Sequence, residues 1–290
     1  MEFISVFDVF KIGVGPSSSH TLGPWKAAAR FIDHCKKNNL HKNAGKTRVS
    51  LYGSLSLTGK GHATDLAVMM GLAGYDPETV DTLAIPEIIS NIKSKQCLTI
   101  DTQEVHFQPD FDIHFEKDFL PFHANGMIFR IESNNNEVYS ETYYSVGGGY
   151  IVKEGESLAD FENAPPHPFP VENSKQLLSY CEKHKKSISE IVLENELIDR
   201  SKQVINNKLL AIWNVMLESM YHGCHTKGTL PGILKVKRRA TDVTENLLPD
   251  KTYQNPKEWI EYIRTSRPGF QDMLKWAGSF AIAVNEVNAS

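Results

Sequence analysis

A run of small hydroxyl side chains and one imidazole lies near the start of the chain, between the two Gly-Pro corners of "KIGVGPSSSHTLGP". Because this loop comes just before a predicted helix, whose N-terminus attracts anions, its hydroxyl and N–H groups suit a small carboxylate or phosphate. The alternative is that a hydroxyl of the loop simply caps the helix. The candidate substrate-binding residues here are Ser17, Ser18, Ser19 and Thr21, and the candidate catalytic residue is His20.

A second loop of similar composition, "GSLSLTGKGHATD", holds Lys60 and His62 among glycines before another predicted helix. A histidine titrates near neutral pH, so His62 suits the role of a general base, and Lys60 suits a substrate carboxylate. The alternative for His62 is a structural role against its own helix. A third cluster, "YYSVGGGY", contains Ser145 and Gly147 and lacks the spacing of a nucleotide-binding motif. We expect the first two loops to converge on one ligand.

The elements that must position these loops follow from periodicity and turn signals. Helices are predicted over 24–39, 62–76 and 86–95, a strand over 49–52, and a hairpin-rich sheet between 97 and 152. From residue 174 onward the pattern is helical. The fold class is therefore α+β. An N-terminal β-sheet domain with flanking helices covers 1–162, a proline-rich linker covers 163–173, and an incomplete all-helical domain covers 174–290.

The composition of the 290 residues excludes several classes of function. With 31 basic and 35 acidic residues the formal charge is −4, so nucleic acid is not an expected partner and a small molecule is. No apolar run reaches the length of a membrane span and no secretory signal is present, which makes the cytoplasm the expected location. The four cysteines have neither disulfide nor zinc spacing and are expected to be reduced thiols: Cys35, Cys97, Cys181 and Cys224.

Five segments resemble, in this order, the bacterial iron-sulfur L-serine dehydratases: "SVFDVFKIGVGPSSSHTLGP", "YGSLSLTGKGHATDLAVMMGL", "YYSVGGGYIV", "GTLPGILKVKRRA" and "AIAVNEVNAS". The resemblance implies a β domain related to the substrate-sensing domain of some phosphoglycerate dehydrogenases, followed by a helical domain that carries a 4Fe–4S cluster. It implies conversion of L-serine to pyruvate and ammonia, in amino-acid catabolism and gluconeogenesis, with the unique iron of the cluster acting as a Lewis acid. A homodimer is expected.

The resemblance also assigns roles to individual residues. Residues 17–21 match the loop that contacts substrate or cluster, His62 matches the histidine thought to act as base, and Ser145 and Gly147 match a strand end near the site. The cluster cysteines of the family are expected beyond Ser290, and none of the four cysteines of this chain occupies their positions. No metal ligand is therefore assigned within this chain, which is expected to be inactive alone.

Two other functions are consistent with the same residues. The first is a regulatory module that binds L-serine or another small carboxylate, or an inactive fragment without cluster ligands. The second is a hydrolase with a serine of the opening loop as nucleophile and His20 as base. It ranks last, because the serine and the histidine are adjacent in sequence and no G-x-S-x-G motif is present.

Overall fold

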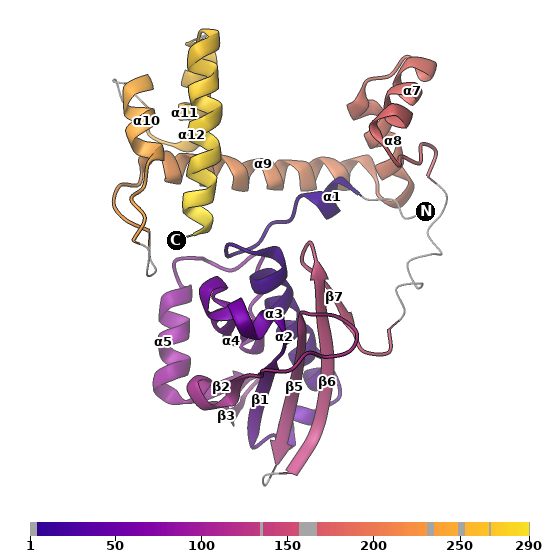
Figure 1. The fold of residues 1–290 in the computed structure, drawn as a ribbon, viewed down its shortest axis with the longest axis vertical. Coiled ribbons are helices and arrows are strands. Elements are labelled where there is room, and N and C mark those ends of the chain that lie inside the picture. Colours follow the sequence, from indigo (N-terminus) through magenta and orange to yellow (C-terminus); the bar gives the residue numbers. More distant parts are fainter. Residues whose placement is uncertain are drawn as a thin grey trace. The chain divides into compact units, whose positions relative to one another are not determined.

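The computed structural model describes residues 5–133, 136–156, 167–230, 235–248, 253–266 and 268–289, without the side chain of Asn43. These residues form two compact units, the first from residue 11 to 156 and the second from residues 5–10 together with 167–289. Part of the expected linker, 163–166, and residues 231–234 of the fourth family-like segment lie outside the described residues. The first unit contains the sheet and the second is helical, so the α+β prediction is confirmed (Figure 1).

A seven-stranded mixed sheet forms the first unit, in the order β2-β3-β1-β5-β6-β7 with β4 paired to β1. β1 runs parallel to β3 and β4 and antiparallel to β5, and β5, β6 and β7 form two successive hairpins. The predicted hairpins are thus present, whereas the parallel pairing of β1 was not predicted. The strands are β1 (Lys46–Leu51), β2 (Cys97–Ile100), β3 (Gln103–His106), β4 (Ile113–Phe115), β5 (Gly126–Ser133), β6 (Asn136–Gly147) and β7 (Tyr150–Lys153).

Three longer helices of this unit match the predicted ones: α2 (Gly23–Lys37), α4 (Thr64–Leu72) and α5 (Ile85–Lys95). Phe31 of α2 stacks on Phe129 of β5 with 5.4 Å between ring centroids, which anchors the helix on the sheet. The ring of Phe31 is fully buried, and burial of such a side chain stabilises the fold by about 1.5–3 kcal/mol. Helix α4 packs closely on α2 at Gly71, where a β carbon would lie 2.4 Å from the carbonyl oxygen of Trp25.

Segments that the sequence predicts as open loops are short helical turns in the structure. Ser18–Leu22 forms a π-helical turn that leads directly into α2, and the Ser17 hydroxyl caps it by accepting the His20 N–H at 3.1 Å. The second loop folds into α3 (Ser54–Thr58) and a 3-10 turn (Gly59–His62). A further short helix, α6 (Pro109–Asp112), precedes β4. The candidate residues therefore lie on defined backbone.

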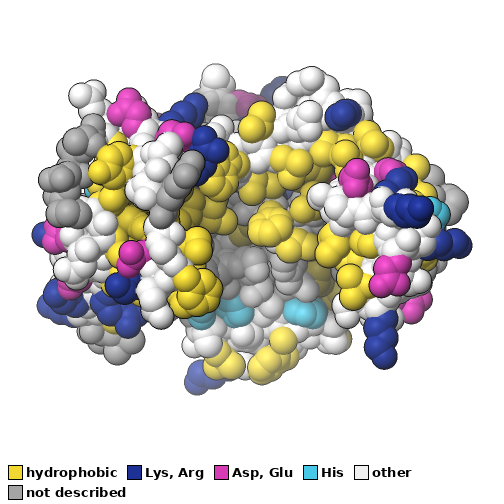
Figure 2. Space-filling model, turned by 90° about the horizontal axis from the view of Figure 1, so that it is seen from above, with side chains coloured by type: hydrophobic (Ala, Val, Ile, Leu, Met, Phe, Trp, Pro, Cys, Tyr) yellow, Lys and Arg dark blue, Asp and Glu magenta, His cyan; other side chains and the backbone are white. Residues whose placement is uncertain are grey.

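The second unit consists of helices, several of which begin at a side-chain cap such as Ser187, Ser201 or Asn255. Its core contains Trp259 and Trp276, whose ring centroids are 6.1 Å apart. Many hydrophobic side chains remain on the face of this unit seen in Figure 2. None of the described helices combines the length and apolar character that a membrane crossing requires. The helices are α1 (Val6–Val9), α7 (Ser174–His184), α8 (Ile188–Asp199), α9 (Lys202–His225), α10 (Ala240–Leu247), α11 (Pro256–Thr265) and α12 (Phe270–Asn288).

Candidate active site

The two histidines of the glycine-bounded segments are neighbours in the first unit. The ring centroids of His20 and His62 are 4.9 Å apart, with 34° between the ring planes. His20 lies in the π-helical turn before α2, and His62 ends the 3-10 turn before α4. The close packing of α2 against α4 is what brings the two helix starts, and so the two imidazoles, together.

Two buried threonines brace the backbones of these histidines against each other. Thr21 donates its hydroxyl to the carbonyl oxygen of His62 at 2.8 Å, and Thr64 donates its own to the carbonyl oxygen of His20 at 2.6 Å. Each threonine thus follows one histidine and holds the other. The two hydrogen bonds therefore hold the backbone of the His20 turn against the backbone of the His62 turn.

His62 presents one free ring nitrogen. Its Nδ1 lies 3.0 Å from the carbonyl oxygen of Thr58 and must carry the proton of that bond, because a carbonyl oxygen only accepts. In the neutral ring Nε2 then holds the lone pair, and no described residue donates a hydrogen bond to it. A half-exposed imidazole with a fixed Nδ1–H and an open Nε2 has the form of a general base.

His20, by contrast, has both ring nitrogens engaged by serine hydroxyls. Ser19 Oγ lies 3.0 Å from Nδ1, and Ser54 Oγ lies 2.8 Å from Nε2. Burial lowers the pKa of His20 below its ordinary value of 6.5, the nearby His62 lowers it further, and a hydrogen bond to Ser54 acts in the opposite direction. His20 is therefore neutral at pH 7. Its single ring proton can be on either nitrogen, because each neighbouring hydroxyl can either donate or accept a hydrogen bond.

The strand end at Ser145 supports the first loop from behind. Ser145 is fully buried and donates its hydroxyl to the carbonyl oxygen of Ser19 at 2.8 Å. Its own backbone is held on both sides by Asn125, through bonds of 3.0 Å each. Gly147 begins the glycine turn between β6 and β7 with φ of 106°, and Gly149 of that turn packs against Leu22 of the π-helical turn. These residues position the loop.

The other predicted substrate-binding residues differ in what they offer to a ligand. Ser18 is exposed, and its hydroxyl has no hydrogen-bond partner among the described residues. Lys60 is exposed too, with its ammonium nitrogen 5.2 Å from the ring centroid of Phe115. The Ser17 hydroxyl is engaged in the cap, and Thr21 is buried in the brace. Ser18 and Lys60 are therefore the groups of this set that are open to a bound molecule.

Three residues that contact the histidine pair or its supports were not singled out from the sequence. Ser54 and Thr64 belong to the second glycine-bounded segment, where Ser54 begins α3 and Thr64 begins α4, so a hydroxyl at the start of each helix was a usable signal. Asn125 precedes β5, far along the chain from both loops, and its local sequence carries no comparable signal.

The cysteines present do not fit a 4Fe–4S cluster, which needs several thiolates directed at one point. They lie on four separate elements, α2, β2, α7 and α9, two in each unit. Burial raises the pKa of Cys35 to about 12 and also raises that of Cys224, which favours the protonated thiol over the thiolate. Among the described residues no three His, Cys, Asp or Glu side chains form a group that could hold a metal ion.

Comparison with known proteins gives a consistent result for both units. The family described as serine dehydratase beta chain matches residues 5–156, and the family described as serine dehydratase alpha chain matches residues 183–290. The L-serine dehydratase of Haemophilus influenzae is 39% identical over 290 residues, and L-serine dehydratases 1 and 2 of Escherichia coli are 40% and 41% identical over 290 and 291 residues. Each alignment covers 99% of this chain and 61% of the relative, so the chain spans about three fifths of their length. The chain belongs to the serine dehydratase family.

Proposed function

We propose that this chain provides the substrate-binding and proton-transfer residues of an L-serine dehydratase, which eliminates water from L-serine to give pyruvate and ammonia. The observation that carries the proposal is the histidine pair, with a neutral His20 and an open Nε2 on His62 whose rings are 4.9 Å apart. The names of the relatives support the choice of substrate. The beta-chain family matches the unit that carries the pair.

In the proposed reaction Nε2 of His62 removes the α-proton of L-serine, and the Cα–H electron pair forms the Cα–Cβ double bond as the Cβ–O bond breaks. The imidazole pair then donates one proton to the departing hydroxide, which leaves as water, so the protons balance. The aminoacrylate that remains hydrolyses to pyruvate and ammonia. Removal of a proton by a positioned imidazole accelerates a reaction by about 10²–10⁴-fold.

The ends of the amino acid are bound by groups that are open in the structure. We assign the carboxylate to the exposed Ser18 hydroxyl and the Lys60 ammonium, at the start of the π-helical turn and beside His62. Ser17, Ser19 and Thr21 shape the turn that presents these groups, and Ser145 and Gly147 support it. A charged lysine with a hydroxyl suits a carboxylate, since hydrogen bonds between charged partners are the stronger ones.

We further propose that the active enzyme is a cytoplasmic homodimer and contains the 4Fe–4S cluster that the family resemblance implies, on cysteines other than these four. The four cysteines are dispersed over both units, two of them with raised pKa, and supply no common donor set. The proton transfer assigned to His62 does not depend on where that cluster is bound.

The proposal is tested with the natural full-length protein, reconstituted anaerobically with iron and sulfide, by following pyruvate release from L-serine. We expect turnover in the wild type and a loss of about 10²–10⁴ in kcat for His62→Gln. The matched control is His114→Gln, which removes an exposed histidine on β4 and is expected to retain full activity. Full activity of His62→Gln would exclude His62 as the base.

The same experiment separates the alternatives. Binding of L-serine by calorimetry without any turnover, despite a bound cluster, would indicate the regulatory module. The hydrolase has one observation in its favour, the 3.0 Å contact between Ser19 Oγ and His20 Nδ1. A fluorophosphonate probe that labels Ser19 would support a hydrolase, whereas no labelling would exclude a reactive nucleophile there.

A further inference from the structure

The residue between His62 and helix α4 has a strained backbone. Ala63 has φ of 54° and ψ of 36°, in the left-handed region, where the β carbon of an L-residue comes too close to a carbonyl oxygen. Elsewhere in the chain this conformation occurs in more usual settings, for example at Asn39, whose side chain tolerates it, and at Gln96 and Lys185, which end helices. Ala63 instead precedes the first residue of a helix, so its conformation needs another cause.

The local sequence favours a different path for the chain. Alanine is the best helix former and a poor N-cap residue, and Ala63 makes no side-chain cap. With ordinary helical angles at Ala63, the 3-10 turn would continue into α4 as one helix, and the His62 carbonyl oxygen would accept the N–H of Leu66. In the structure that carbonyl oxygen accepts the Thr21 hydroxyl instead, at 2.8 Å. Contacts outside the segment therefore impose the break at Ala63.

Two hydrogen bonds hold the strained residue from both sides, and strain persists only where the surrounding structure imposes it. Thr21 binds the residue before Ala63, through the carbonyl oxygen of His62. Thr64, the residue after Ala63, donates its hydroxyl to the carbonyl oxygen of His20. Both threonines are buried, so a relaxed backbone would leave their hydroxyls without these acceptors, which is costly in a buried place.

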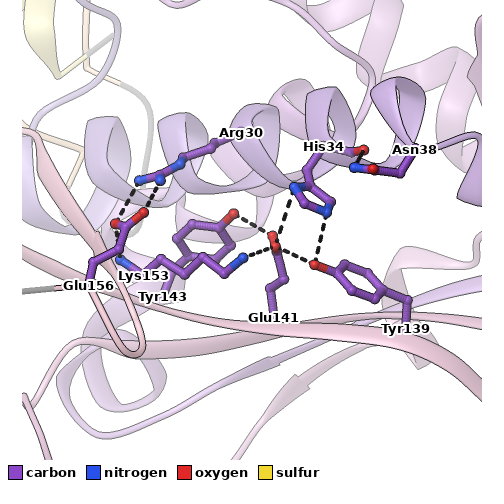
Figure 3. A network of polar contacts seen from close by, with 8 residues as sticks. All are labelled: Arg30, His34, Asn38, Tyr139, Glu141, Tyr143, Lys153 and Glu156. Carbon is purple, nitrogen blue, oxygen red and sulfur yellow. Dashed lines mark hydrogen bonds and ion pairs between the residues drawn. The ribbon is translucent and has the colours of Figure 1, made fainter.

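Helix α2, to which the other side of this arrangement is attached, is fixed on the sheet and cannot easily yield. Arg30 donates from both arms of its guanidinium to the carboxylate of Glu156, after β7 (Figure 3). One turn further along α2, the ring of His34 stacks on Tyr139 of β6 with 5.3 Å between centroids, and Tyr139 donates to the buried carboxylate of Glu141. The strain is therefore borne by the segment that carries the second histidine.

We propose that Ala63 is a positioning residue for the base of the reaction: its left-handed backbone turns His62 out of line with α4 and toward His20. The two rings are 4.9 Å apart, and Nε2 of His62 stays open there. The inference rests on the function proposed for His62 and deepens it by naming what aims the imidazole. Because the backbone angles matter and the methyl group does not, a glycine should substitute for Ala63 and a β-branched residue should not.

Two substitutions separate the backbone from the side chain. Ala63→Gly removes the strain, so we expect its unfolding temperature to rise by about 2–4 °C, while kcat for L-serine stays close to the wild-type value. Ala63→Val keeps an apolar side chain but avoids the left-handed region, and we expect kcat to fall by about 10–10²-fold, as for a displaced catalytic group. Activity is measured in the anaerobically reconstituted full-length protein.

The matched control is Gln96→Val at the end of α5. Gln96 is exposed, has the same φ and ψ as Ala63 and belongs to the same unit, so valine is equally unsuited to its backbone. We expect this variant to lose stability without losing kcat, because its strain does not reach the histidine pair. An equal loss of kcat in Gln96→Val and Ala63→Val would show general destabilisation and would overturn the proposal.

The NMR titration of His20 gives a readout that does not need turnover. Since the nearby His62 lowers the pKa of His20, the midpoint should rise in Ala63→Val and keep its wild-type value in Ala63→Gly and Gln96→Val. A wild-type midpoint in Ala63→Val, or a lower unfolding temperature for Ala63→Gly, would also overturn the proposal. Absence of turnover in the wild-type protein would instead refute the dehydratase function, and the His20 midpoint would still test whether Ala63 aims His62.

Discussion

The two imidazoles of the candidate site differ in what their nitrogens contact. His62 has Nδ1 tied to a backbone carbonyl and Nε2 open, whereas His20 is held at both nitrogens by serine hydroxyls. The first arrangement fixes a tautomer, because a carbonyl accepts only. The second does not, because a hydroxyl can donate or accept. His62 can therefore act as a base of defined orientation. His20 instead joins Ser19 to Ser54 through hydrogen bonds whose direction can reverse.

The titration of His20 follows from its surroundings. Burial and the adjacent His62 lower its pKa, so its NMR titration midpoint is expected below about 6.5. Replacing His62 by Gln removes the second cause and should raise the midpoint of His20, without restoring the free value, since the burial remains. A midpoint at or above the free value in the wild type would contradict this.

The lowered pKa of His20 also determines how the free energy of unfolding changes with pH. The unfolded chain binds a proton at His20 near pH 6.5, whereas the folded protein does so only at lower pH. The unfolded state is thus favoured progressively as the pH falls through about 6.5. His20→Gln should reduce this part of the pH dependence, which urea unfolding between pH 5 and pH 8 measures.

Ser54 is expected to act as a positioning residue for His20. Ser54→Ala removes the hydroxyl 2.8 Å from Nε2, and we expect kcat to fall about tenfold, or 1.4 kcal/mol, with KM nearly unchanged. Ser54→Thr, which restores a hydroxyl, should recover part of the loss. Ser56→Ala on the same short helix is the control. A loss in Ser56→Ala as large as in Ser54→Ala would indicate general damage to α3.

At the scale of single residues, the sequence indicated which residues lie at the site better than it indicated what each side chain contacts. The glycine-bounded pattern indicated His20 and His62, which the structure places side by side. It could not show that the hydroxyls of Thr21 and Ser145 donate to carbonyl oxygens of the protein, because the direction of a side chain depends on packing. Asn125 was out of reach for the same reason, since its partner is 20 residues away.

At the scale of elements, the contact between α2 and α4 sets the distance between the two histidine-bearing turns. It requires a glycine at position 71, because a β carbon there would meet the Trp25 carbonyl oxygen at 2.4 Å and the Ala28 β carbon at 2.6 Å. Neither the backbone nor a short alanine can move aside cheaply. The helices would have to separate, and the two turns with them.

Gly71→Ala is therefore expected to destabilise the first unit by about 1–3 kcal/mol, the usual cost of overpacking. Gly278→Ala is the comparison, because Gly278 lies in α12 with nothing within 4 Å of the added carbon. It should be neutral or stabilising by up to about 1 kcal/mol, as for Gly→Ala in a helix. Urea unfolding of both variants checks this, and a stable Gly71→Ala would show that the helices can separate freely.

Periodicity predicted most of the longer elements correctly, and α2, α4 and α5 lie where expected. It did not predict that β1 pairs in parallel with β3 and β4, since strand order depends on contacts between distant segments that local patterns do not encode. The short helix α3 was missed as well. Its residues, "SLSLT", combine leucine with hydroxyls and follow Gly53 at φ of 55°, a backbone state that the sequence alone does not specify.

At the scale of the whole molecule, the first described residues belong to the second unit. Ser5 and Val6 both bind the carboxylate of Glu196 in α8, at 2.7 Å from Ser5 Oγ and 2.7 Å from the Val6 N–H. Arg200 donates to the same carboxylate at 2.9 Å. Glu196 is almost fully buried, so it ties α1 to the helical unit before the chain enters the sheet. A single domain boundary placed along the sequence cannot show that residues 5–10 belong to the same unit as residues 167–289.

Removing this carboxylate should loosen the attachment. Glu196→Ala leaves the Ser5 hydroxyl, the Val6 N–H and the Arg200 guanidinium without their shared acceptor, and we expect a loss of about 3 kcal/mol. Circular dichroism at 222 nm during thermal unfolding reports it, since the second unit is helical. Glu182→Ala, an exposed position on α7, is the control and should change little. Equal unfolding temperatures for the two variants would contradict the assigned role of Glu196.

The first turn of helix α2 continues directly from the turn that carries His20, and the same helix packs on α4 at Gly71. The place of the imidazole therefore depends on how the whole of α2 is seated in the core. Substitutions at buried positions of this helix, far from any substrate, should lower the turnover and the resistance to unfolding together.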